Sequence, residues 1–264
     1  CVVSFKEIDE MWNEYNKYAF RSDQNTERLA RIEGEFAKSA TECSEFLNRT
    51  RSTVAQMVQQ FQMKQAAEAD KRTEIAKTGV LDTVNMINYR WSEDIFMKNE
   101  VHTDGKNHGI VMYIDWSGSM YGIIKDTIEQ LLILTEFCQK VNIPFDVYAF
   151  TSKRIAGEFD EEKSVWIDAQ YEGRTDDSEL LKPHHFSLIQ FLSSDMKTRE
   201  YNQAVQNLHY LGSTQSYYGC DTPSEFGMGC TPLNEAIMCA MTQVPAFQKK
   251  HGVQIVNTVF LTDG

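Results

Sequence analysis

One short apolar run that ends in an aspartate constrains the fold of this chain more than any other feature. The run covers residues 109–115 and reads Gly-Ile-Val-Met-Tyr-Ile-Asp. A run of this length without polar alternation is typical of a strand that is buried on both faces of a sheet. Residues 144–151 and 253–261 have the same character. We therefore predict three buried strands at the centre of an α/β domain.

Helical patterns lie between these predicted strands. Apolar residues recur at helical spacing over residues 123–135 and 232–241, and weaker helical patterns cover 178–193 and 199–211. Strands that alternate with helices predict a doubly wound, mostly parallel sheet of the Rossmann-like kind. The chain stops at Gly264, directly after the last predicted strand. We expect a fragment in which this domain is truncated at its C-terminus.

The N-terminal part of the chain is predicted to be helical. Residues 5–20 have helical spacing, and apolar positions over residues 29–61 alternate in steps of three and four. This pattern is typical of a coiled coil or of a helix packed on its own chain in a helical hairpin. A second amphipathic stretch is predicted to end near Lys77, because Thr78 and Gly79 supply a stop signal. The helices could therefore mediate self-association or pack within one molecule.

These patterns divide the chain into three regions. We predict a helical, coiled-coil-like region over residues 1–78, a connector over 79–108 and the α/β domain over 109–264. Within the connector, we expect Trp91, Ile95 and Phe96 to dock on another part of the protein.

Charge and composition exclude several classes of function. The formal net charge of −12 argues against nucleic-acid binding, which needs clustered lysines and arginines. The sequence shows no signal peptide and no apolar run long enough to span a bilayer. The six cysteines form no Cys-x-x-Cys pair, so we expect scattered thiols rather than a disulfide framework. These features predict a cytoplasmic protein.

The common motifs of independent enzymes are missing from the sequence. It contains no Gly-x-x-x-x-Gly-Lys-Ser/Thr loop, so we expect no ATP hydrolysis by this chain. It also contains neither His-Glu-x-x-His nor Gly-x-Ser-x-Gly, the commonest metalloprotease and hydrolase motifs. We therefore predict no catalytic residues and a non-catalytic role.

Oxygen-bearing side chains follow the predicted strands at the edge where parallel sheets bind ligands. Asp115, Ser117 and Ser119 follow the first strand, Thr231 precedes a helix, and Asp263 follows the last strand. Mg²⁺ prefers about six oxygen ligands. The sequence therefore predicts a site for Mg²⁺, or for Mn²⁺ or Ca²⁺, with one position open to a carboxylate of a partner.

Each of these pieces also has a simpler interpretation. Asp115 and the two serines suit a turn and a helix N-cap. Thr231 before Pro232 suits a cap and first helical turn without a metal, and Thr-Asp-Gly after a strand suits an ordinary turn. All three pieces nevertheless occur at the predicted edge of one sheet, and this combination favours the metal site.

These residues also carry a family resemblance. The set Asp115-x-Ser117-x-Ser119, Thr231 and Asp263 resembles the metal-ion-dependent adhesion site of von Willebrand A domains. Upstream, residues 79–82 (Gly-Val-Leu-Asp), Tyr89 and residues 94–96 (Asp-Ile-Phe) are similar to the CobT-type subunit of aerobic cobaltochelatase. The resemblance covers the chain from about residue 79 to its end.

The resemblance implies a function within a larger complex. In that family, the subunit works with a ring-forming AAA+ ATPase and a porphyrin-binding subunit to insert Co²⁺ into a corrinoid ring in cobalamin biosynthesis. An acidic residue of the ATPase is the expected ligand of the adhesion site. The segment from Gly229 to Leu233 looks more like magnesium-chelatase D subunits, and no long acidic linker is evident. The alternatives are a partner of a MoxR-type AAA+ ATPase in assembly or remodelling, and a self-associating structural protein.

Overall fold

The computed structural model divides the chain into two compact units. It describes residues 2–8, 10–12, 26–72, 74–81, 90, 96–101, 107–152, 158–160, 165–167, 186–214 and 226–263. The larger unit consists of Cys1–Val54 and His108–Gly264, and the smaller unit consists of Ala55–Asn107. These bounds differ from those of the predicted regions 1–78, 79–108 and 109–264.

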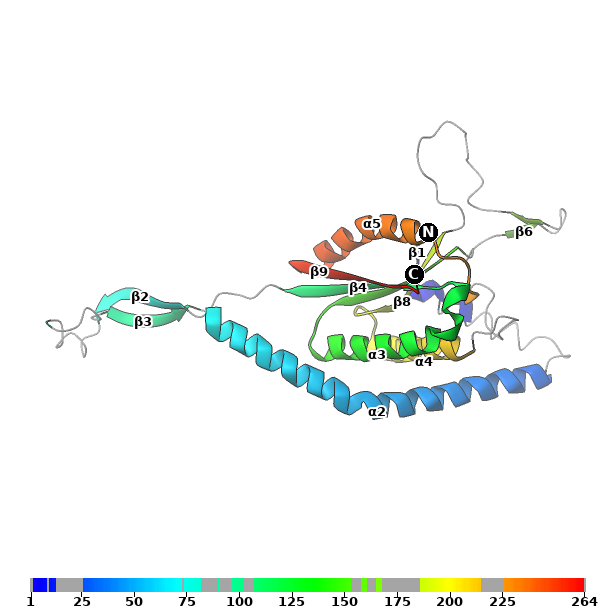
Figure 1. Ribbon diagram of the computed structural model, residues 1–264, viewed down its shortest axis with the longest axis horizontal. Helices are drawn as coiled ribbons and strands as arrows, with labels where there is room; N and C mark the ends of the chain where they lie inside the picture. The colour runs from blue at the N-terminus through cyan, green and yellow to red at the C-terminus, as the bar shows by residue number, and fades with distance from the viewer. Residues whose placement is uncertain are drawn as a thin grey trace, which may run out of the picture. The chain divides into compact units, whose positions relative to one another are not determined.

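A five-stranded mixed sheet forms the centre of the larger unit (Figure 1). β4 lies parallel to both β5 and β9, β8 is antiparallel to β5, and β1 pairs in parallel with β8. The order across the sheet is β1 (Val2–Val3), β8 (Ser187–Ser193), β5 (Phe145–Thr151), β4 (His108–Asp115) and β9 (Ile255–Leu261).

This architecture confirms the α/β class and the existence of the three predicted strands. The prediction that residues 253–261 form a buried central strand was wrong, since β9 lies at the edge of the sheet and none of its residues is fully buried. The sheet is mixed because β8 runs against β5. The prediction of a weak helix over 178–193 was wrong for its described part, since Ser187–Ser193 forms β8. Six of the seven residues of β8 are buried, so its side chains meet a core on both faces. Such a continuous apolar run has no periodicity that distinguishes a strand from a buried helix.

Helices cover both faces of the sheet (Figure 1). The sequence patterns at 123–135, 199–211 and 232–241 correspond to these helices and are confirmed. One hydrophobic cluster joins the first two helices to one face of the sheet, and a second cluster joins the third helix to the other face. The three helices are α3 (Ile124–Lys140), α4 (Thr198–Thr214) and α5 (Leu233–His251).

The N-terminal part of α2 (Thr26–Arg72) packs on its own chain. Within the larger unit, the Phe36 ring lies 5.2 Å from that of Tyr210, and the Ser39 hydroxyl lies 2.9 Å from Nδ1 of His209. Cys43 is buried in the same core as α3 and α4. The helical pattern over 29–61 is therefore confirmed, and this part of the helix packs within one molecule.

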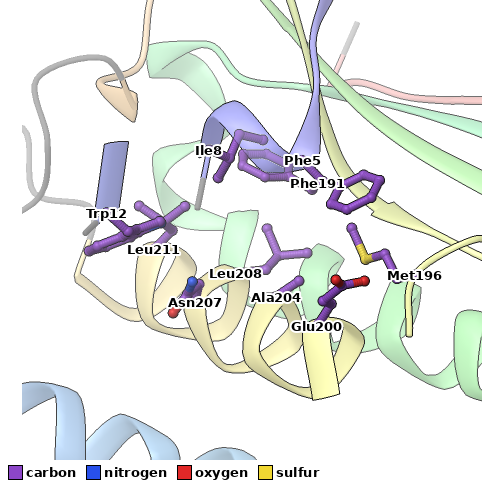
Figure 2. Close-up of a pocket in the computed structure, with 10 residues that line it drawn as sticks. All are labelled: Phe5, Ile8, Trp12, Phe191, Met196, Glu200, Ala204, Asn207, Leu208 and Leu211. Atoms are coloured by element: carbon purple, nitrogen blue, oxygen red, sulfur yellow. The ribbon is translucent and has the colours of Figure 1, made fainter. Parts of the chain in front are cut away.

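A short N-terminal helical segment also contacts the larger unit. Residues 5–8 and 10–12 are helical, which agrees with the pattern predicted over 5–20 for the part that is described. Figure 2 shows Phe5, Ile8 and Trp12 on this segment beside Phe191 of β8 and Leu211 of α4. The segment thus covers part of the sheet and brings Trp12 into the aromatic core.

The smaller unit contains an antiparallel hairpin of β2 (Glu74–Leu81) and β3 (Phe96–Val101). The helix predicted to reach Lys77 ends instead at Arg72, and Thr78 and Gly79 lie within β2. Phe96, predicted as a docking residue of a connector, begins β3, whereas Trp91 and Ile95 lie outside the described residues. Paired strands therefore replace the predicted helix end and part of the connector.

β6 (Glu158–Asp160) and β7 (Val165–Ile167) form a short antiparallel pair. Among the described residues, no helix is long and apolar enough to cross a membrane.

Candidate metal centre

Asp115 is the last residue of β4 and is fully buried. β4 runs between the parallel strands β5 and β9, so its carboxyl end adjoins the carboxyl ends of both neighbours. The backbone N–H of Trp116 continues the pairing with β5 by donating to Phe150 O at 2.9 Å. The sheet therefore fixes the aspartate at the edge where loops leave three parallel strands.

The first of these loops brings two serine hydroxyls together. Ser117 is buried and Ser119 is exposed, and their Oγ atoms lie 2.9 Å apart. The 3₁₀ helix η2 (Gly118–Gly122) produces this turn, in which the Met120 N–H donates to Ser117 O at 3.2 Å. Ser117 occupies the N-cap position of η2 but makes no side-chain cap hydrogen bond. The cap interpretation of this serine is therefore wrong.

The second loop pairs with the first through Gly229. The Gly118 N–H donates to Gly229 O at 2.9 Å, and the Gly229 N–H donates to Trp116 O at 3.1 Å. Thr231 follows in an exposed position, two residues before α5 begins. Pro232 occupies the N-cap position of α5, and no side chain caps this helix. The Thr231 hydroxyl is thus not used as a helix cap.

The third loop follows β9, which pairs in register with β4 up to Ile114 and Leu261. The Thr262 hydroxyl donates to Asp115 Oδ2 at 2.9 Å. Asp263 is exposed, and its carboxylate raises the pKa of Asp115. Sequence reasoning did not select Thr262. Its position directly after a strand parallel to β4 was the available signal.

Burial is the main cause of a raised pKa at Asp115. The hydroxyls of Ser117, Thr262 and Thr231 act in the opposite direction, while the charge of Asp263 raises the pKa further. Ser117 and Thr231 lie close enough to lower the pKa of Asp115. Even so, Asp115 Oδ1 is buried and has no hydrogen-bond partner among the described residues. Among the described residues, no lysine, arginine or histidine forms an ion pair with Asp115.

Three loops therefore gather the five residues that the sequence selected around one buried carboxylate. The oxygen atoms of these five residues that could coordinate a metal belong to two carboxylates and three hydroxyls. Such hard oxygen ligands are the ones that Mg²⁺ and Ca²⁺ prefer. A buried carboxylate oxygen without a partner is costly, and a cation would satisfy it. The donor set fits a divalent cation held by Asp115, Ser117, Ser119, Thr231 and Asp263.

This donor set differs from the commonest metal-binding clusters in proteins. Within the described ranges, no group of three or more histidines, cysteines, aspartates or glutamates could hold a metal ion. The four described cysteines, Cys43, Cys138, Cys230 and Cys239, are free thiols. A cation at this edge would therefore depend on neutral hydroxyls as much as on carboxylates.

An aromatic cluster holds the second loop against the end of β4. Trp116 is fully buried, and its Nε1–H donates to Phe226 O at 2.7 Å. The Phe226 ring stacks on Trp12 at 5.6 Å, and the Trp116 ring lies 5.2 Å from Phe191. This role of Trp116 was not predicted, because it depends on segments that are distant in the sequence.

Comparison with known proteins does not assign this site. No protein-family model, curated protein or solved structure matches the chain. The arrangement of these residues is therefore the basis for inferring a function.

Proposed function

We propose that this protein is a metal-dependent protein-interaction module of the von Willebrand A type. Its cation, Mg²⁺ or alternatively Mn²⁺ or Ca²⁺, is held by the five side chains at the carboxyl ends of β4 and β9 and in the loop before α5. The observation that carries the proposal is the buried Asp115 carboxylate: its Oδ1 has no hydrogen-bond partner among the described residues, although hydroxyls from three loops lie around the carboxylate. Helices on both faces of the sheet support a doubly wound fold of this type.

The donor set also suggests how such a site recognises a partner. Two carboxylates offset the charge of a divalent cation, while three neutral hydroxyls leave it attractive to a further anion. A carboxylate from another protein is the ligand that such a cation would accept. The module therefore binds an acidic side chain and breaks no covalent bond.

The sequence resemblance suggests the class of partner. It supports an AAA+ ATPase as the protein that supplies the acidic residue, in a complex most like aerobic cobaltochelatase. This chain would be a non-catalytic subunit of that complex, and Co²⁺ would be the substrate of the whole assembly. Because residues 229–233 depart from the CobT-type pattern, a MoxR-type ATPase in assembly or remodelling is the second candidate partner.

Calorimetric titration with Mg²⁺ tests the proposal directly. Asp115→Asn removes the central charge and keeps the side-chain size. Asp146→Asn is the matched control, since Asp146 is also buried and its Oδ1 also has no partner among the described residues, but it lies at the amino end of β5. We expect saturable binding to the unmodified chain and to Asp146→Asn, and none to Asp115→Asn. Equal binding by both variants would contradict the proposal.

A further inference from the structure

Four of the large hydrophobic side chains that are exposed among the described residues lie in or near the loops of the candidate metal centre. Among the described residues, six such side chains are exposed, and Met63 is the one that belongs to the smaller unit. The other five are between 43% and 74% exposed. We call these five the apolar rim, and they are Tyr121, Ile123, Ile237, Met238 and Met241.

The residues of the apolar rim come soon after the two loops that carry proposed metal ligands. Tyr121 and Ile123 lie two and four residues beyond Ser119. Ile237 and Met238 lie in the second turn of α5, about 6–8 Å along the helix axis from its first residue. Figure 1 shows that α3 and α5 begin at the same end of the sheet, on its two faces. Four of the rim residues therefore flank the candidate metal centre from both sides, while Met241 lies about 12 Å along α5 from its first residue.

Packing among the described residues does not account for these exposed side chains. α5 is anchored on the sheet by Ala236, Ala240 and Phe247, which lie on its buried face. Beside the first loop, Met120 and Ile124 are buried while the residues between them are exposed. Scattered exposed apolar residues are ordinary, but a concentration of them around one site marks an interaction surface.

We propose that the partner of this protein presents a carboxylate flanked by large aliphatic or aromatic side chains. The carboxylate completes the coordination of the cation, so this inference rests on the proposed function. The flanking side chains pack on Tyr121 and Ile123 on one side of the site and on Ile237 and Met238 on the other. Methionine is unbranched and polarizable, which suits it to contact with such partner side chains.

Short labelled peptides test this inference on the whole chain with saturating Mg²⁺. The first peptide has an aspartate between two leucines on each side, the second has serines in place of the leucines, and the third has asparagine in place of the aspartate. Fluorescence anisotropy gives the dissociation constants. We expect the first peptide to bind at least tenfold more tightly than either of the others, since burial of even one leucine stabilises by more than 1 kcal/mol.

Variants of the chain locate the contact. Met238→Gln keeps the length and helix propensity of the side chain, and Tyr121→Gln removes the ring. Each should weaken binding of the leucine-flanked peptide about tenfold, while Met63→Gln is the control and should leave it unchanged. Calorimetry should show unchanged Mg²⁺ binding by all three variants.

Two failures are distinguishable. Absence of Mg²⁺ binding by the unmodified chain would overturn the proposed function. If Mg²⁺ binds but the leucine-flanked and serine-flanked peptides bind equally, or neither binds, the proposed function stands and the role of the apolar rim is overturned.

Discussion

Two buried aspartates on neighbouring strands differ in what surrounds them. Asp115 ends β4 and Asp146 lies near the start of β5, so the two carboxylates occupy opposite edges of one sheet. In both, Oδ2 accepts a hydrogen bond from a hydroxyl, at 2.9 Å from Thr262 and at 3.1 Å from Tyr148. In both, Oδ1 has no partner among the described residues, and burial raises the pKa.

The difference lies in the neighbouring charges. Lys250 lowers the pKa of Asp146 and forms an ion pair with Asp195, so a cationic side chain of the protein already lies near this carboxylate. Hydroxyls and a second carboxylate lie near both aspartates: Asp263 beside Asp115, and Asp195 beside Asp146. An unpartnered oxygen alone therefore does not define a metal site. Among the described residues, the nearby lysine distinguishes Asp146 from Asp115, which has no cationic side chain close to it.

The largest effect should come from Trp116, which joins the Asp115 edge to the second loop. Trp116→Ala removes a fully buried ring and the bond from Nε1 to Phe226 O. We predict a loss of about 3–5 kcal/mol in the free energy of unfolding, together with weaker Mg²⁺ binding. Urea denaturation and calorimetry measure the two effects. Trp116→Phe keeps an aromatic ring but loses the hydrogen bond to Phe226 O, so it should lower the free energy of unfolding by only about 1 kcal/mol. An equal loss of stability in both variants would contradict this role of Trp116.

Mg²⁺ should stabilise the fold only through the Asp115 edge. At a concentration one hundred times its dissociation constant, a ligand that binds only the folded state adds about 2.7 kcal/mol. We predict this gain, measured by urea denaturation with and without Mg²⁺, for the unmodified chain and for Asp146→Asn. Asp115→Asn should show no gain. A similar gain in Asp115→Asn would place the cation elsewhere.

Single hydroxyls should contribute less to metal affinity than the central carboxylate. We predict that Ser119→Ala weakens Mg²⁺ binding about tenfold, because one oxygen ligand is lost and water can replace it only in part. Ser193→Ala is the control, since its hydroxyl lies beside Asp146 and lowers the pKa of that carboxyl. Calorimetry should show unchanged Mg²⁺ affinity for Ser193→Ala, and equal losses in both variants would refute the distinction between the two edges.

The smallest effect should be a pH-dependent gain in stability from Asp146→Asn. Because burial raises the folded-state pKa of Asp146 above 3.8, the folded chain holds this proton more tightly than the unfolded chain. The associated stability is present below about pH 4 and is lost as pH rises through the raised pKa. Asn cannot ionise, so the variant should be about 1 kcal/mol more stable at pH 7 and should lose this advantage in acid. Urea denaturation between about pH 4 and pH 7 measures the stability difference between Asp146→Asn and the unmodified chain. A difference that stays constant over this range would contradict the prediction.

The sequence predicted β4 and β5 because both strands are buried on both faces, and it predicted β9 from an apolar run although this edge strand is only partly buried. The apolar runs in β4, β5 and β9 are short and bounded by polar loops, and this pattern identifies them as strands. Because the three strands are parallel, the residues that follow them lie at the same edge of the sheet. The positions of Asp115, Ser117 and Asp263 follow from this parallel arrangement. The sequence could not show that Thr262 donates to Asp115 or that Trp116 anchors residue 226, since both contacts depend on strand register and on distant packing.

Other elements lacked a distinguishing local pattern. β8 was predicted as a helix because Leu188, Ile189, Phe191 and Leu192 suit either structure when both faces are buried. The β2–β3 hairpin was missed because its strands mix charged and apolar residues and pair across residues 82–95. In both cases pairing with a distant strand, rather than local propensity, determines the structure.

Paramagnetic broadening by Mn²⁺ tests the central comparison most directly. Amide NMR signals of the whole chain would be recorded during titration with substoichiometric Mn²⁺, which can replace Mg²⁺ at oxygen sites. We predict the strongest broadening at Ser117, Ser119, Thr231 and Asp263, which meet around Asp115, and clearly weaker broadening at Asp146 and Ser193, which lie about four residues further along the strands, roughly 13 Å away. Broadening centred on Asp146, or none at the Asp115 edge, would contradict this prediction.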